Sequence, residues 1–91
     1  MPGYRLLIEE VLKARLKKLS KKNRPLYDAV LAKTKEILEN PTHYKPLRYD
    51  LKGLRRVHLE KSFVLVFEVD EENRAVTLVD LRHHDDIYSR K

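Results

Sequence analysis

The second half of the chain contains three runs of hydrophobic residues with the spacing expected of β-strands. In residues 54–60, Val57 and Leu59 alternate with charged or titratable residues, so one face of this strand is apolar and the other polar. Residues 63–69 are apolar at nearly every position, which is typical of a central strand covered on both faces. After a short acidic turn, residues 74–82 are expected to return antiparallel to that strand.

The first half of the chain predicts a short strand followed by a helix. Residues 4–8 form an apolar run near the N-terminus, and we interpret them as the first strand. Over residues 9–19, leucines recur at positions i, i+4 and i+7, with Val11 beside them, and four basic residues, among them Arg15, lie elsewhere on the helix. This spacing predicts an amphipathic helix with a cationic outer face.

A second helix is predicted after a polar break over residues 20–24. Pro25 suits the first turn of a helix, where its missing N–H costs nothing. This helix is expected to end at Asn40, because the residue before a proline is pushed out of the α region. Residues 41–53 contain two prolines and a glycine and are predicted to form a loop.

This order of elements predicts a single α+β domain that covers residues 1–91. Two N-terminal helices are expected to pack on one face of a four-stranded, mostly antiparallel sheet, which leaves the opposite face open. Arg56 and His58 share one face of their strand, about 7 Å apart at the usual rise per residue. Asp80, Arg82 and His84 share a face of the last strand. We therefore expect a basic, histidine-rich patch on the open face.

The amino-acid composition limits which binding partners and which kinds of site this chain can have. The formal net charge of +6 and a pI near 9.7 favour a polyanionic partner, either nucleic acid or an acidic protein segment. The absence of cysteine excludes disulfides, thiolate nucleophiles and cysteine-based zinc sites, and it fits a reducing cytoplasm. No apolar run reaches the roughly 18 residues of a membrane span, so a soluble, cytoplasmic protein is expected.

Residues 83–86 (HHDD) are of types that bind metal ions, but the geometry of a strand argues against a metal site there. Consecutive strand residues point to opposite faces, so their side chains cannot converge on one ion without a turn. We therefore expect neither a metal nor another cofactor.

The order of elements, the segment KPLRYDLKGLRRVHLEKSFVLVFEVD and the ending LVDLRHHDDIY resemble the RelE/ParE superfamily of bacterial and archaeal toxins, in particular its RelE, YoeB and YafQ branch of ribosome-associated endoribonucleases. The resemblance covers essentially the whole chain and implies a RelE-like fold. It also implies the toxin component of a type II toxin-antitoxin system that cleaves messenger RNA at the ribosomal A site. An acidic cognate antitoxin would hold such a toxin silent in a heteromeric complex.

The resemblance implies a catalytic set position by position. YafQ-like members have histidines at the places of His58 and His84 and an aromatic residue at that of Tyr88. RelE-like members have lysines at the places of Arg56 and His58, an arginine at that of Arg82 and a tyrosine at that of Tyr88. The implied catalytic residues are therefore Arg56, His58, Arg82, His84 and Tyr88.

Three positions depart from the patterns of the branch. Val64 stands where RelE-like enzymes carry a phosphate-binding arginine, and Ser62 stands where YafQ-like enzymes carry an acidic residue. Lys45 replaces a histidine of YafQ-like proteins, so a cation is kept there but a proton shuttle is not.

RNA cleavage through the 2′-OH explains why such a set would suffice. The hydroxyl needs a base, the leaving 5′-oxygen needs an acid, and the phosphate that gains charge needs cations. We assign Arg56 and Arg82 to the phosphate and His58 and His84 to proton transfer, while Tyr88 either stacks on a base or polarises the nucleophile. Further cations are expected to contact messenger or ribosomal RNA: Lys45, Arg48, Lys52, Arg55 and Lys61.

Other interpretations of the same residues stay open. Arg55 and Arg56 fit an ordinary solvated strand edge, and His58 fits a half-buried polar residue bonded to its neighbours. At the level of function, the alternatives are a ParE-like toxin that acts on gyrase without nuclease chemistry and a degenerate homologue that only binds its antitoxin.

Overall fold

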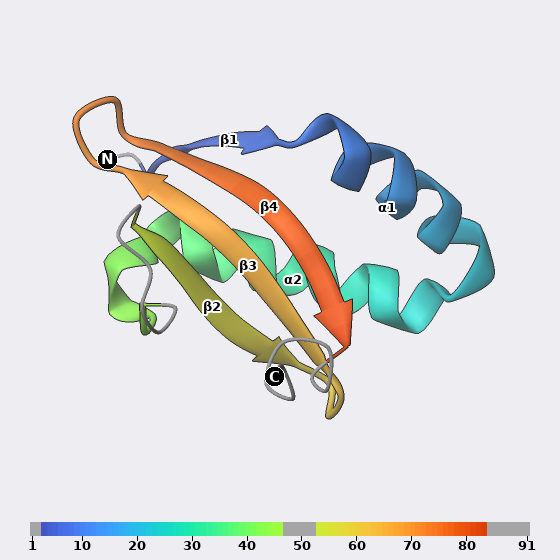
Figure 1. Cartoon of the computed structure of the whole chain (residues 1–91). Helices are drawn as coiled ribbons and strands as arrows, with labels where there is room; N and C mark the ends of the chain where they lie inside the picture. Colours follow the sequence, from blue (N-terminus) through green and yellow to red (C-terminus); the bar gives the residue numbers. More distant parts are fainter. Residues whose placement is uncertain (1–2, 47–52, 84–91) are drawn as a thin grey trace, which may run out of the picture.

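The computed structural model describes residues 3–46 and 53–83 of the 91-residue chain (Figure 1). Its elements follow the predicted order of strand, helix, helix and three strands, with a short 3-10 helix between the second helix and the second strand. In chain order they are β1 (Arg5–Ile8), α1 (Glu10–Lys22), α2 (Arg24–Glu39), η1 (Pro41–His43), β2 (Leu54–Leu59), β3 (Phe63–Asp70) and β4 (Ala75–His83).

The strands form one four-stranded sheet in the order β1-β4-β3-β2. β3 pairs antiparallel with β2 and β4, whereas β1 pairs parallel with β4, so the sheet is mixed. Figure 1 shows α2 crossing behind the strands, and α1 packs against α2 and β4. The predicted α+β class, with two helices on a four-stranded and mostly antiparallel sheet, is confirmed. Within the part of the chain that the structure describes, no helix is long and apolar enough to cross a membrane.

The core lies between the helices and one face of the sheet. It consists of residues whose spacing follows the period of each element, every third or fourth residue in the helices and mostly every second residue in the strands. Its buried members are Leu12, Leu16, Leu26, Val30, Ile37, Leu59, Leu65, Phe67, Val76, Leu78 and Leu81.

The connection between the helices is much shorter than the sequence predicts. The expected polar break over residues 20–24 is wrong, because α1 continues to Lys22 and α2 begins at Arg24. Asn23 alone separates them and caps both: its N–H donates to the Leu19 carbonyl at 2.9 Å, and its side-chain oxygen accepts the Leu26 N–H at 3.2 Å. Polar residues on an exposed helical face remain helical when the caps are satisfied.

The turn between β3 and β4 is held by Asp70. Its carboxylate accepts the side-chain amide of Asn73 at 2.8 Å and the backbone N–H of Asn73 at 3.1 Å. The side-chain hydrogen bond is the main reason that the pKa of Asp70 lies below its ordinary value of 3.8. Because the folded state favours the ionised carboxylate, this stabilisation is present above pH 3.8 and is lost as the pH falls through the lowered folded pKa.

Replacing Asn73 by alanine should therefore raise the pKa of Asp70 toward 3.8, because the side-chain amide donor is removed and the preferred turn geometry is weakened. An NMR titration of the Asp70 carboxyl carbon in the folded protein measures this directly. If the Asn73→Ala variant titrated at the same pH as the original protein, the hydrogen bond would not be the cause.

Candidate functional site

The face of the sheet opposite the helices collects residues from three strands. Cα partners on neighbouring strands share a face, so the register defines two rows across β2, β3 and β4. Val57 and Leu59 of β2 pack with the core, which turns the alternate residues of β2 to the other side. The first row is Arg56, Val66 and Asp80, and the second row is His58, Val64 and Arg82.

The structure thus brings Arg56, His58 and Arg82 onto one face. His58 and Arg82 are separated by one strand, which places their Cα atoms about 10 Å apart at the usual strand spacing. Arg56 lies two residues from His58 on the same strand, about 7 Å away. A group bound between the His58 and Arg82 side chains would therefore have an imidazole on one side and a guanidinium on the other.

The floor of this site is apolar. Val64 and Val66, the central members of the two rows, are 0% and 5% exposed although they face away from the helices. β3 is therefore buried on both faces, as its sequence predicts. An apolar floor lowers the local dielectric, and this strengthens the attraction between the surrounding cations and an anion placed above it.

Arg56 is fixed by the chain segment beside the open edge of β2. Its backbone N–H donates to the Lys45 carbonyl at 3.1 Å, and its Nη1 donates to the Pro46 carbonyl at 2.9 Å. Pro46 also forms a β-bridge with Arg55. The Pro46 carbonyl that accepts from Nη1 orients the Arg56 guanidinium, and because this acceptor is neutral, the bond does not itself neutralise the group.

Arg55 lies apart from the three residues of the open face. It pairs with Phe67 and so belongs to the face that carries the helices. Its Nη1 donates to the Tyr44 carbonyl at 2.6 Å, which ties the loop after α2 to the sheet. Its predicted contact with RNA stays a prediction, and this placement gives Arg55 a role in holding the loop.

The remaining predicted residues are only partly placed. Lys45 is exposed beside the edge of β2, and Lys61 is exposed in the turn between β2 and β3. Four others lie outside the described residues: Arg48, Lys52, His84 and Tyr88.

A β-bulge in β4 decides which way Arg82 points. Val66 pairs with Asp80 and Phe67 pairs with Leu78, so Val79 is an extra residue without a partner on β3. Val76, Leu78 and Leu81 all belong to the core, and the step from Leu78 to Leu81 is three residues rather than two. The bulge therefore leaves Leu81 in the core and places Asp80 and Arg82 on the open face.

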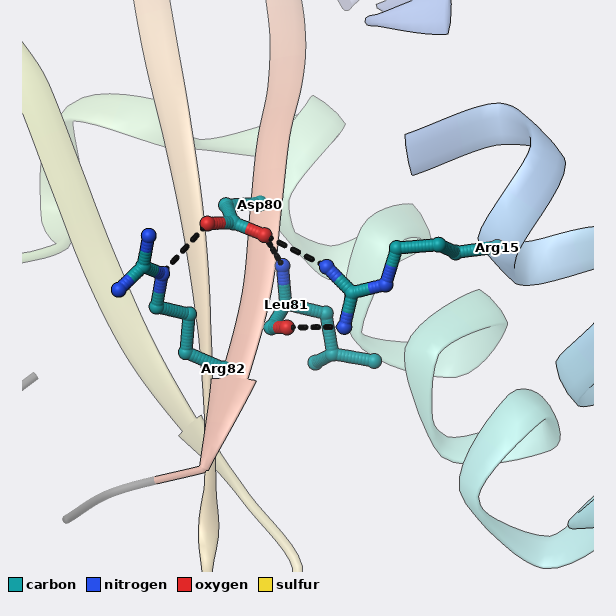
Figure 2. Close-up of polar contacts among 4 residues, drawn as sticks. All are labelled: Arg15, Asp80, Leu81 and Arg82. Atoms are coloured by element: carbon teal, nitrogen blue, oxygen red, sulfur yellow. Dashed lines mark hydrogen bonds and ion pairs between the residues drawn. The ribbon is translucent and has the colours of Figure 1, made fainter. Parts of the chain in front are cut away.

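Arg82 is the end of a polar cluster that reaches to α1 (Figure 2). Its Nε donates to Oδ2 of Asp80 at 2.6 Å, and Nη1 of Arg15 donates to Oδ1 of the same carboxylate at 2.8 Å. Nη2 of Arg15 donates to the Leu81 carbonyl at 2.7 Å, and the Leu81 N–H donates to Oδ1 of Asp80 at 2.8 Å.

The sequence did not mark Arg15 as part of a site, because the helical pattern placed it only on a cationic outer face. The one available signal is its position beside the apolar stripe, three residues after Leu12 and one before Leu16, both of which are buried. Among the described residues, no three histidine, cysteine, aspartate or glutamate side chains are grouped so that they could hold a metal ion.

Comparisons with known proteins agree with this architecture. A family model described as the ParE toxin of the type II toxin-antitoxin system parDE matches residues 6–88. A curated relative named "Putative toxin RelE4", from Methanocaldococcus jannaschii, is 50% identical over 88 residues, which cover 97% of this chain and 94% of the relative.

Two solved structures share the fold. A mutant of the Escherichia coli toxin RelE in the free state superposes with a TM-score of 0.73 at 24% identity, covering 96% of this chain and 92% of that one. The toxin-antitoxin complex RelBE2 from Mycobacterium tuberculosis gives a TM-score of 0.73 at 22% identity, covering 91% of this chain and 93% of that one. These two structures show the same fold, and the family match and the relative at 50% identity show that the chain belongs to the ParE toxin family of type II toxin-antitoxin systems, within the RelE/ParE superfamily.

Proposed function

We propose that this toxin is an endoribonuclease that cleaves messenger RNA at the ribosomal A site and thereby inhibits translation. The observation that carries the proposal is the strand register, which places Arg56, His58 and Arg82 around an apolar floor on the open face of the sheet. Two guanidinium groups and an imidazole around a shielded surface suit the cleavage of a phosphodiester.

The reaction proposed is attack of the ribose 2′-OH on the adjacent phosphorus, with departure of the 5′-oxygen. Arg56 and Arg82 would bind the phosphate oxygens, whose charge grows in the transition state. Histidine is the side chain that most often transfers protons in catalysis, and we assign His58 to this role. On the strength of the sequence resemblance, His84 supplies the second proton-transfer group and Tyr88 the aromatic one. The substrate provides the nucleophile and the protein the cations, so the reaction needs no metal or other cofactor.

The charge of the chain supports a partner that is itself an anion. The net charge of +6 favours binding to ribosomal RNA and message, and the exposed Lys45 and Lys61 would extend the cationic surface around the site. The M. tuberculosis relative was solved as a toxin-antitoxin complex, which supports an antitoxin partner for this chain too. We propose a heteromeric complex in the cytoplasm, in which an acidic antitoxin masks the basic face.

A second candidate function is supported by the name of the matching family, ParE. A ParE-like toxin would act on gyrase and would not cleave RNA. A third candidate, a degenerate toxin that only binds its antitoxin, is supported by Val64, which stands between His58 and Arg82 where RelE-like enzymes carry an arginine.

One experiment separates the three candidates. The purified protein is incubated with translating ribosomes, new 5′ ends on the message are mapped, and gyrase supercoiling is assayed in parallel. Message cleaved within the A-site codon supports the endoribonuclease. Intact message with inhibited gyrase refutes it in favour of the second candidate, and intact message with active gyrase favours the third. Equal cleavage of naked RNA would remove the requirement for the ribosome.

A further inference from the structure

We propose that Asp80 is a positioning residue that aims Arg82 at the scissile phosphate, and that Arg15 of α1 holds Asp80 in place. This inference rests on the proposed function and assigns parts to two residues that lie outside the set implied by the sequence. It is carried by the hydrogen bonds of the cluster formed by Arg15, Asp80, Leu81 and Arg82 (Figure 2).

The Asp80 carboxylate is fixed by donors at both oxygens. Oδ1 accepts from Nη1 of Arg15 and from the Leu81 N–H, both at 2.8 Å, while Oδ2 accepts from Nε of Arg82 at 2.6 Å. Its side chain is 26% exposed, whereas those of Arg15 and Arg82 are about half exposed. An isolated ion pair at the surface orients little, but a carboxylate that is also bonded to the backbone has few other positions available.

This arrangement sets the direction of the Arg82 guanidinium. Nε is the nitrogen nearest the chain, and its bond to Asp80 fixes the plane of the group. Figure 2 shows the Arg82 guanidinium on the side of β4 on which β3 lies, with one of its terminal nitrogens pointing away from Asp80. On that side the register places Val64 and then His58. Two terminal nitrogens presented together form the fork that binds two oxygens of one phosphate.

The charges of the cluster are compatible with anion binding. Arg15 and Arg82 each carry one positive charge and Asp80 carries one negative charge, so the cluster keeps a net charge of +1. Asp80 therefore orients Arg82 without by itself neutralising the three-residue group of Arg15, Asp80 and Arg82. If Asp80 contacted Arg82 alone, the pair would be neutral and would attract a phosphate less strongly.

Arg15 contacts the backbone of β4 just beyond the point where β1 ends. β1 ends at Ile8, which pairs with Leu78, and beyond that point β4 has no neighbouring strand on this side among the described residues. There, Arg15 donates to the Leu81 carbonyl, and Asp80 accepts the Leu81 N–H. Arg15 needs two donors in a fixed geometry to reach both the carboxylate and the carbonyl, which arginine provides and lysine does not.

The test compares Asp80→Ala, Arg82→Ala and the double variant. Asp80→Ala should lower kcat for cleavage of ribosome-bound message about 10-fold and raise KM by no more than about 3-fold, because a misdirected guanidinium loses mainly transition-state contacts. Affinity is then measured with ribosomes carrying a message whose A-site codon has 2′-deoxyriboses and is not cleaved. Arg82→Ala should weaken this binding about 10-fold and Asp80→Ala about 3-fold. The double variant should bind no more weakly than Arg82→Ala alone, because Asp80 acts through Arg82.

Two further variants make the result specific. Asp28→Ala breaks a similar contact, from Nε of Arg24 to Oδ1 of Asp28 at 3.0 Å on the exposed side of α2, and should change neither kcat nor affinity. Arg15→Lys, which keeps the charge but loses one of the two contacts, should have a smaller effect than Arg15→Ala. Melting temperatures of all variants report whether they remain folded.

The outcomes distinguish this inference from the proposed function. If the original protein cleaves message and Arg82→Ala does not, but Asp80→Ala is fully active, the positioning role is refuted and the proposed function stands. If Asp80→Ala weakens binding equally with and without Arg82, Asp80 acts by another route and the inference is again refuted. If the original protein does not cleave message at all, both are refuted.

Discussion

Replacing Arg82 by alanine is expected to lower the rate of message cleavage by about 100- to 1,000-fold, the usual loss when one preorganised donor to a developing charge is removed. Arg82 is half exposed, stands one strand away from His58 across the buried Val64, and is held by Asp80. No other described side chain of β4 offers a cation on this face. The loss should appear mainly in kcat, because the phosphate gains its charge in the transition state.

Cleavage is measured on translating ribosomes, and growth inhibition on induced expression gives an independent result in cells. The matched control is Arg24→Ala, which removes an arginine that is 66% exposed on α2 and also pairs with an aspartate. This control should remain as active and as toxic as the original protein. Undiminished cleavage by Arg82→Ala would refute the assignment of Arg82 to the phosphate.

Replacing Phe67 by alanine is expected to cost about 3–5 kcal/mol of the free energy of unfolding, the usual range for a buried phenylalanine. Phe67 lies on the central strand β3, is 0% exposed, and packs edge-on against Tyr44 with ring centroids 5.8 Å apart. Domains of this size are stable by about 5–15 kcal/mol, so the loss is a large part of the total. The melting temperature should fall by roughly 15–30 °C.

Thermal unfolding followed by circular dichroism measures this effect. The control is Val11→Ala on α1, where the side chain is 76% exposed and its truncation should shift the melting temperature by less than about 3 °C. A shift of the same small size for Phe67→Ala would mean that the helices do not cover this face of the sheet as described. Because Phe67 points away from the open face, any folded fraction should keep its cleavage activity.

Most of the fold could be predicted from the spacing of hydrophobic residues. The leucines of α1 recur with the period of a helix, and the residues of β2 alternate with the period of a strand. Elements with one regular period can be predicted from local sequence. The helix boundary was less predictable: Ser20, Lys21 and Lys22 look like a break, yet they complete α1 because Asn23 caps both helices. The boundary is set by the capping of one residue, Asn23. A run of polar residues does not reveal it, because such a run fits either a loop or an exposed helical face.

The candidate site was predictable on β2 and only partly on β4. Strict alternation from Val76 and Leu78 would place Asp80 and Arg82 with the core. The apolar Leu81 indicates the opposite, so no single period of two fits the whole of β4. The bulge at Val79 resolves this conflict, and it depends on the pairing with β3 rather than on local sequence. Arg15 was missed for a similar reason, because its contacts with Asp80 and Leu81 join residues more than 60 positions apart.

The bulge at Val79 also limits how the length of this chain can vary. If Val79 were deleted, Asp80 would follow Leu78 directly, and regular alternation would keep Leu81 in the core and Arg82 on the open face. If Val79 were kept but paired regularly with Val66, the end of β4 would rotate by half a turn, so that the Leu81 side chain met water and the Arg82 guanidinium was directed beneath the helices. The strand therefore has one residue that it can lose without inverting its side chains, whereas β3, which has no such residue, cannot. Among descendants of this sequence, the loss of one residue at position 79 should be tolerated more readily than the loss of one residue from the middle of β3.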